Sequence, residues 1–320
     1  METLTARLAR FTHDLTWNDI PDDARLAAKR FLFDSVGCAL GGLKQEDPAL
    51  YTRVLDFLGG NPHATVIGTG QKRSLVQAAL VNSLLIRVMD YNDIYWMQDP
   101  SHPSDIIPAA LSTGEYLGRS GADVLTGVVI AYEIEMRLCE FAVPGIRERG
   151  WHHATLTQFA SPFTAGKLLG LSVEQLVSAA GIAGSAHCTT GSVTAGKLTM
   201  MKNTVDPLAT AAGVEAALLA REGYTGPEHA LDGKESLMHV LGEGWDTEKL
   251  VDRLGETFRI TRCGMKAYPT EALTHAPITA LLNLIRKHDI RPDDIRAVRV
   301  KTIARAADIL SDPSKYDPQT

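Results

Sequence analysis

Several features that carry familiar chemistry are missing from this chain. Its four cysteines, at positions 38, 139, 188 and 263, form no Cys-x-x-Cys pair, so neither a zinc ribbon nor a local disulfide framework is indicated. Gly68-Thr69-Gly70 is followed by Gln-Lys-Arg-Ser, which is not a Rossmann fingerprint. The sequence also lacks a Gly-x-x-x-x-Gly-Lys-Ser/Thr loop and a Gly-x-Ser-x-Gly nucleophile elbow. These absences disfavour dinucleotide, P-loop and α/β-hydrolase chemistry.

The chain also lacks targeting and membrane signals. Its N-terminus, METLTARLARFTHDL, is amphipathic and carries acidic residues, unlike the apolar core of a signal peptide. No stretch approaches the roughly 18 uninterrupted apolar residues that suggest a membrane span. Isolated thiols fit a reducing compartment. We therefore expect a cytoplasmic protein without a membrane partner.

Positive charge is not in excess either. The chain has 32 basic and 38 acidic residues, which gives a formal charge of −6. Such a chain shows no electrostatic footprint for nucleic acid, so we expect no nucleic-acid partner. An anionic substrate would have to be attracted by a local cationic pocket.

The 320 residues suggest about two domains. Residues 1–253 are predicted to form a helical domain, because apolar residues recur there at helical spacing and rarely alternate with polar ones. Frequent Ala and Gly on these segments favour close helix packing. The predicted helices cover residues 24–42, 74–89, 103–117, 121–140, 154–169, 172–187, 205–222 and 247–253.

The character of the sequence changes near residue 254. The segments 258–263 (FRITRC) and 297–303 (AVRVKTI) are strand-like, residues 274–288 read as a helix, and residues 291–294 as a turn. Two strands and one helix bury little core by themselves. Residues 254–320 are therefore predicted to be a small, incomplete α+β domain.

One polar cluster lies between two apolar helices. Asp90, Asp93 and Asp99 fall within ten residues and are followed by His102. Local sequence leaves three interpretations open: a metal site, a solvated loop with capping aspartates, or an acid/base site in which aspartates tune a histidine.

Three further segments carry candidate residues. Trp151-His152-His153 precedes a predicted helix, and the free backbone N–H groups at its N-terminus could donate to an imidazole or to a bound anion. Lys202 precedes the helix predicted to begin at residue 205, where a lysine could bind a carboxylate or simply be solvated. Lys266, Tyr268 and then His275 follow the first predicted strand of the second domain, where a turn could close over a substrate.

Taken in order, these segments resemble the MmgE/PrpD family, which contains 2-methylcitrate dehydratases, cis-aconitate decarboxylases and an iminodisuccinate epimerase. The resemblance extends over nearly the whole chain, from the Asp-x-x-Asp segment to His275. It is carried by HPSDIIPAAL (102–111), SGADVLTGVVIAYEIEMRL (120–138), GWHHATLTQFASPFTAGKLLGL (150–171), TMMKN (199–203), AALLAREGYTGPEHALDG (216–233) and MKAYP (265–269).

The resemblance implies a mainly α fold, with a large all-helical domain and a smaller α+β lid. It further implies a homodimer, a site between the two domains, and no cofactor or metal. Its catalytic residues would be His102, Asp90 and His152, with Asp90 orienting His102 for proton transfer. Its substrate-binding residues would be Lys202, Lys266, Asp93, Tyr268 and His275.

Three departures from the family pattern bear on the substrate. Ile94 stands where some relatives carry Thr, and Asp90 is twelve residues before His102 instead of ten. Asp206 stands where dehydratase-like members have small residues. Unless a cation pairs with it, this negative charge disfavours a tricarboxylate.

The resemblance therefore implies a lyase acting on a small polycarboxylic acid, with 2-methylcitrate dehydration ranked first. A cis-aconitate-type decarboxylase or an iminodisuccinate-type epimerase is the alternative. Relatives continue beyond the lid segment in which this chain ends, so we also expect a truncated chain, with a catalytically inactive helical dimerisation module as a further alternative.

Overall fold

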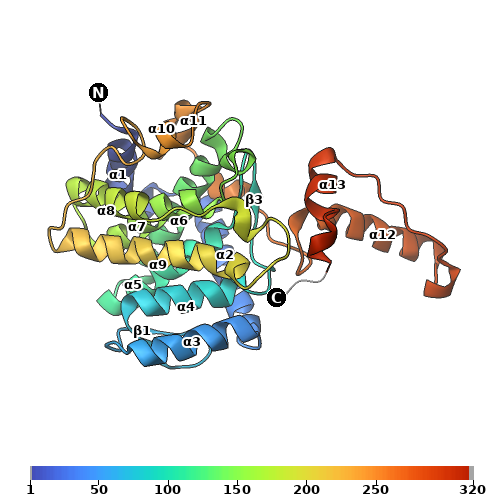
Figure 1. Cartoon of the computed structure of the whole chain (residues 1–320). Coiled ribbons are helices and arrows are strands. Elements are labelled where there is room, and N and C mark those ends of the chain that lie inside the picture. The colour runs from blue at the N-terminus through green and yellow to red at the C-terminus, as the bar shows by residue number, and fades with distance from the viewer. Residues whose placement is uncertain (1, 317–320) are drawn as a thin grey trace.

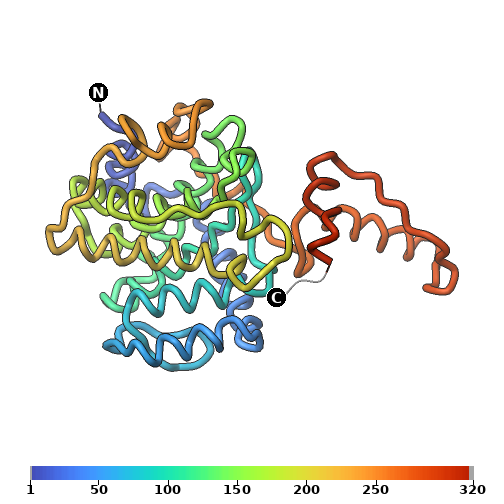
Figure 2. The backbone as a smooth tube through the Cα atoms, viewed as in Figure 1, coloured from blue at the N-terminus to red at the C-terminus, as the bar shows by residue number. Residues whose placement is uncertain are grey.

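The computed structural model describes residues 2–316, and those residues form thirteen α-helices and two short two-stranded sheets. Figures 1 and 2 show a helical body and an arm that projects from it. The predicted mainly α fold is confirmed. The helices of the body are α1 Leu4–Asp14, α2 Asp22–Gly42, α3 Glu46–Leu58, α4 Leu75–Arg87, α5 Ile107–Leu117, α6 Gly121–Phe141, α7 Ala154–Leu169, α8 Val173–Ala186, α9 Met201–Arg221, α10 Leu237–Val240 and α11 Thr247–Val251.

The sheets are minor elements of this body. Strand β1 (Ala64–Thr65) pairs antiparallel with β2 (Lys72–Arg73). Strand β3 (Tyr95–Trp96) pairs antiparallel with β4 (Pro100–Ser101), with Tyr95 opposite Ser101. The second pair folds the segment between α4 and α5 into a hairpin, which places the predicted Asp/His cluster at one edge of the body.

Helix α7 lies at the centre of the body and packs closely against α9. A Cβ added to Gly213 of α9 would lie 2.4 Å from the Cβ of Ser161 in α7. A Cβ on Gly184 of α8 would lie 2.2 Å from the Phe159 ring. These contacts show why small residues are frequent on the helices, and they confirm the interpretation of close packing.

The predicted helix positions agree with the structure to within a few residues. The helix predicted at 154–169 has the bounds of α7, and the predicted end at Gly42 is that of α2. The first turn predicted for 103–117 is a 3₁₀ helix, Pro103–Ile106, which leads into α5. Helix α9 begins at Met201, four residues earlier than predicted, so Lys202 lies within its first turn.

The strand predicted over residues 258–263 is wrong. This segment contains the 3₁₀ helix Arg259–Arg262. The backbone N–H of Arg259 donates to Glu133 Oε2 at 2.6 Å, and its guanidinium lies 3.1 Å from Glu140. A buried carboxylate of α6 thus takes a backbone donor that a strand ladder would need, and a second one holds the same residue by its side chain. Only one bridge forms nearby, between Ile94 and Gly264.

The strand predicted over residues 297–303 is also wrong, because that segment forms no ladder. It belongs to the arm, with α12 (His275–His288) and α13 (Ala304–Leu310). Val298, Val300 and Ile303 are each more than half exposed. A strand needs a partner for its backbone groups, and none of the described residues pairs with this segment. The helix predicted for 274–288 is confirmed, whereas the β part of the lid is not found within residues 2–316.

Among residues 2–316, none of the helices combines the length and the apolar character needed to cross a bilayer.

Candidate active site

Five segments bring the predicted residues together. The end of α4 and the following hairpin carry Asp90, Asp93 and His102, while His152 immediately precedes α7. Lys202 lies in the first turn of α9, and Lys266 follows the bridge at Gly264. In Figure 1, β3 lies on the side of the body from which the arm projects.

Asp90 is the centre of a cationic cluster. Its carboxylate lies 2.7 Å from Arg87 Nη1, 3.0 Å from Lys202 Nζ and 2.7 Å from Lys266 Nζ. Lys266 also donates to the Asp90 main-chain carbonyl at 2.9 Å. Asp90 has a φ of 50°, in the left-handed region, so the backbone turns sharply to place this carboxylate among the three cations.

The electrostatics of this cluster favour bound negative charge. Burial opposes ionisation of Asp90, but Arg87, Lys202 and Lys266 outweigh it and hold the pKa of Asp90 well below its ordinary value. Burial and the charge of Arg87 lower the pKa of Lys202, and burial lowers that of Lys266. The segment therefore holds three cationic side chains around one carboxylate, and the solvated-loop interpretation is wrong for Asp90.

His102 is held by Asp93 and not, as predicted, by the Asp90 carboxylate. Its Nδ1 lies 2.6 Å from the main-chain carbonyl of Asp93. Arg87, Lys202 and Lys266 take the Asp90 carboxylate instead. A carbonyl oxygen only accepts, so Nδ1 carries the proton and Nε2 of the neutral ring presents a lone pair. Burial, with the charges of Arg87 and Lys266, lowers the pKa of His102 well below its ordinary value.

His152 has the opposite tautomer. The backbone N–H of Ala154 donates to its Nδ1 at 3.2 Å, so in the neutral ring Nε2 carries the proton. Burial, followed by the neighbouring His153, lowers the pKa of His152 well below its ordinary value. The site thus contains one neutral histidine that can accept a proton and one that can donate a hydrogen bond.

Beneath these residues lies a buried group that the sequence analysis did not assign to the site. Arg87 Nε lies 3.5 Å from Asp105 and 3.8 Å from Asp206, and His153 Nε2 lies 3.2 Å from Asp206. Burial raises the pKa of Asp105 well above its ordinary value. Burial alone would also raise that of Asp206, but His153 outweighs it and lowers the pKa.

Some of these residues left a signal in the sequence. Arg87 is the one charged residue of the mostly apolar helix α4, and it is only 3% exposed. Such a residue indicates a buried ionic partner. An unpaired Asp206 carboxylate would disfavour the binding of a tricarboxylate. Its pairing with Arg87 and His153 removes that objection.

The remaining predicted residues are placed differently. Asp93 is fully buried, and its carboxylate accepts from Ser104 Oγ at 2.5 Å and from Cys263 Sγ at 3.5 Å, so its contacts shape the hairpin. Burial raises the pKa of Asp93 to about 6. Tyr268 and His275 contact each other, with ring centroids 5.3 Å apart, at the root of the arm. The substrate-binding roles of all three stay predictions.

Glu135 of α6 is a further buried carboxyl next to the site. Its Oε1 accepts from Thr157 Oγ1 at 2.8 Å and from the Ser101 hydroxyl. Its Oε2 has no hydrogen-bond partner among the described residues. Burial raises the pKa of Glu135 to about 7.

One group in the site has the composition of a metal-ligand set. Single donor atoms of His152, His153 and Asp206 lie within 4.8 Å of one another. However, the Arg87 guanidinium lies beside the same Asp206 carboxylate, where its charge opposes a divalent cation. The His152 and His153 rings also lie against each other, with centroids 4.0 Å apart. We interpret the group as a histidine–carboxylate pair; a metal-free site stays a prediction.

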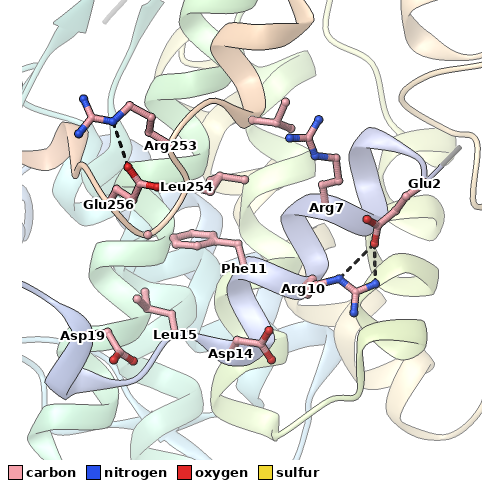
Figure 3. Close-up of a pocket in the computed structure, with 12 residues that line it drawn as sticks. Glu2, Arg7, Arg10, Phe11, Asp14, Leu15, Asp19, Arg253, Leu254 and Glu256 are labelled. Atoms are coloured by element: carbon pink, nitrogen blue, oxygen red, sulfur yellow. Dashed lines mark hydrogen bonds and ion pairs between the residues drawn. The ribbon is translucent and has the colours of Figure 1, made fainter.

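The structure also has a surface cavity of about 660 Å³ that contains none of these residues. It lies between α1 and the segment after α11, with Phe11 and Leu15 among its apolar lining (Figure 3). Its lining carries both signs of charge, and four of the charged side chains form pairs: Arg10 lies 2.6 Å from Glu2, and Arg253 lies 3.2 Å from Glu256. Such a lining presents no excess of one charge to a ligand.

The predicted residues thus converge at the edge of the body. The MmgE/PrpD N-terminal domain matches residues 6–250. The chain belongs to the MmgE/PrpD family. This match includes Asp90, His102, His152 and Lys202, whereas Lys266 lies beyond it.

Curated relatives of this MmgE/PrpD chain have names that denote lyases. A cis-aconitate decarboxylase-like protein, oryM of Aspergillus oryzae, is 29% identical over 97% of this chain and 67% of its own length. The cis-aconitate decarboxylase of Aspergillus terreus is 29% identical over 89% of this chain and 61% of its own length. The 2-methylcitrate dehydratase of Escherichia coli O157:H7 is 29% identical over 48% of this chain and 33% of its own length. The matched region thus spans about two thirds or less of each relative.

Proposed function

We propose that this chain carries the site of a cofactor-independent lyase that acts on a small polycarboxylic acid. The observation that carries the proposal is the convergence of Arg87, Lys202 and Lys266 on one carboxylate beside His102 and His152. Asp90 occupies this cluster as a substrate carboxylate would, which supports carboxylate binding there.

Dehydration is the reaction that the two tautomers favour. Removal of a proton next to a carboxylate produces an enediolate-like dianion, which is costly without compensating positive charge. His102 Nε2 presents the lone pair that can take this proton. Lys202 and Lys266 supply fixed positive charge for the carboxylate, and His152 Nε2–H can donate to a second substrate oxygen. We therefore rank a 2-methylcitrate dehydratase-like hydro-lyase first.

Decarboxylation of a cis-aconitate-type acid is the second candidate. It is favoured by the comparisons, because the two decarboxylase-named relatives match 97% and 89% of this chain and the bacterial dehydratase matches 48%. Decarboxylation leaves a carbanion that must be protonated, so it requires an acid where dehydration first requires a base.

The test is turnover followed by NMR, with 2-methylcitrate, citrate and cis-aconitate supplied separately. We expect one acid to be converted, and we expect His102→Asn and Lys202→Ala each to lower kcat/KM by about a hundredfold or more. Lys234→Ala is the matched control, because the Lys234 side chain is 88% exposed. Unchanged turnover in either site variant would refute the site.

The cellular and oligomeric expectations are part of the same proposal. We propose a cytoplasmic homodimer, and light scattering measures the oligomeric state. A dimer that is neither active nor thermally stabilised by any of these acids would instead favour a helical dimerisation module.

A further inference from the structure

Three imidazole rings, not two, lie together in the site. The His153 ring centroid is 4.0 Å from that of His152 and 5.8 Å from that of His102. His153 is only 6% exposed and immediately precedes α7, so its ring is fixed by the start of that helix. The proton transfers described so far leave this ring without a role.

The three rings differ in their ability to hold a positive charge. His102 Nδ1 faces a neutral carbonyl, and His152 Nδ1 accepts from a backbone N–H, an arrangement that an imidazolium could not make. Only His153 has a carboxylate partner, with Nε2 3.2 Å from Asp206 Oδ1. The Asp206 carboxylate therefore places a negative charge directly beside this ring.

The charged groups around His153 come from several elements. Asp206 is 1% exposed, and neither its two oxygens nor His153 Nε2 makes an aligned hydrogen bond among the described residues, so the two groups face each other as a close charge pair. Arg87 Nε lies 3.8 Å from the other oxygen, Oδ2, so His153 is the nearer of the two nitrogen partners of this carboxylate. The titratable and charged groups that interact with His153 or with its partner are Asp206, Arg87, His102, His152, Glu135, Asp99 and Asp105.

We propose that His153, held as an imidazolium by Asp206, is the general acid that protonates the leaving hydroxyl, while His102 is the base. This inference rests on the proposed dehydration. His102 Nε2 takes the proton from the carbon next to the carboxylate, and the C–H electron pair forms the C=C bond. The C–O bond breaks, and its oxygen takes the proton of His153 and leaves as water. The products are an alkene, one water, a neutral His153 and a protonated His102.

The structure supports this division of work by placing the two rings in contrasting surroundings. At the working pH the histidine that acts as base must be neutral and the histidine that acts as acid must be charged. The two rings therefore need different surroundings, one that favours the neutral form and one that favours the charged form. His102 faces a neutral carbonyl and His153 faces a carboxylate, although the two ring centroids are only 5.8 Å apart. Because the rings are so close, the proton can return from His102 to His153 after water leaves.

The test is the pH dependence of kcat for the converted acid, in wild type, His153→Gln and Asp206→Asn. The wild-type kcat should fall at low pH, where His102 becomes protonated, and at high pH, where His153 loses its proton. His153→Gln should lower kcat by about a hundredfold or more, retain the acid limb and lose the alkaline limb. Asp206→Asn removes the partner charge with little change of shape, so its alkaline limb should move to lower pH.

The exposed pair His13–Asp14 offers a matched control. Its Nδ1–Oδ1 distance is 2.8 Å and both side chains are about half exposed or more, so His13→Gln should leave the profile unchanged. Circular dichroism and thermal melting confirm that each variant is folded. A folded His153→Gln enzyme with wild-type kcat, or one that keeps the alkaline limb, would overturn the role of His153.

A second measurement separates this inference from the proposed function. In protein labelled with ¹⁵N-histidine, the His153 signals are identified by their loss in His153→Gln. We expect an imidazolium at pH 7 that becomes neutral in Asp206→Asn. If the wild-type chain converts none of the acids, the proposed function fails. A neutral His153 in the spectrum would then overturn the charged pair too, whereas an imidazolium that depends on Asp206 would support it.

Discussion

Replacing Glu135 with glutamine should remove one part of the protein's pH-dependent stability. Glu135 is 1% exposed, and both hydroxyls that contact it donate to Oε1. A glutamine Oε1 can accept from the same hydroxyls, while its NH₂ group replaces the unpartnered Oε2. Glu135→Gln therefore imitates the protonated carboxyl with little change in packing.

The magnitude follows from the pKa of Glu135, which burial raises from 4.5 to about 7. Because the folded state then binds the proton more tightly than the unfolded state, the carboxyl stabilises the fold fully below pH 4.5. That stabilisation is lost as the pH rises through about 7. A pKa difference of about 2.5 units corresponds to about 3 kcal/mol in total, of which about 2.5 kcal/mol falls between pH 5 and pH 8.

Urea unfolding of wild type and Glu135→Gln at pH 5 and pH 8 measures this contribution. The free energy of unfolding of the variant, relative to wild type, should rise by about 2.5 kcal/mol from pH 5 to pH 8. Glu222→Gln is the control, because Glu222 is 72% exposed and its variant should show no such rise. A relative free energy that stays constant within about 0.5 kcal/mol would refute the reasoning that Glu135 is a neutral, buried carboxyl at acid pH.

Two other changes test the cationic cluster and the helix packing. Asp90→Asn leaves Lys202 and Lys266 without their carboxylate, so it should cost about 3–5 kcal/mol of stability. Citrate can then take the place of the missing carboxylate, so it should raise the Tm of the variant more than that of wild type. An equal rise in the two proteins would contradict carboxylate binding at this cluster. Gly213→Ala places a Cβ 2.4 Å from a side-chain atom of α7 and should lower Tm by several degrees. Gly37→Ala in α2 is the control, because its Cβ meets no atom within 4 Å and should stabilise the helix by about 1 kcal/mol. A similar Tm for Gly213→Ala and Gly37→Ala would show that close packing of α7 and α9 is unimportant.

Helix positions could be predicted from the sequence because they depend on local patterns. Apolar spacing and the terminal glycines place α2 and α7 to within a residue or two, and the small residues of α9 indicate close packing. The strands near residues 260 and 300 could not be predicted in this way. Strand formation needs a partner at a distance in the chain. In the first segment Glu133 instead takes the backbone N–H of Arg259, while Glu140 pairs with the Arg259 side chain.

The candidate site, too, could be predicted only in part from the sequence. The residue types and their order along the chain determined the family and brought Asp90, His102, His152, Lys202 and Lys266 forward as candidates. Which group orients which is decided only by tertiary structure, because hydrogen bonds join residues distant in sequence. The Asp93 carbonyl holds His102, and the Asp90 carboxylate is bound by lysines 112 and 176 residues away.

The sequence by itself thus determined a helical chain of the MmgE/PrpD family with a set of candidate acids, bases and cations. Tertiary structure alone decided which partner each candidate side chain faces. The two adjacent histidines have the same intrinsic chemistry, yet His152 faces a backbone N–H and His153 faces the buried Asp206 carboxylate. Burial makes these partners decisive, because in a low dielectric the free energy of a charge depends on the few groups that touch it.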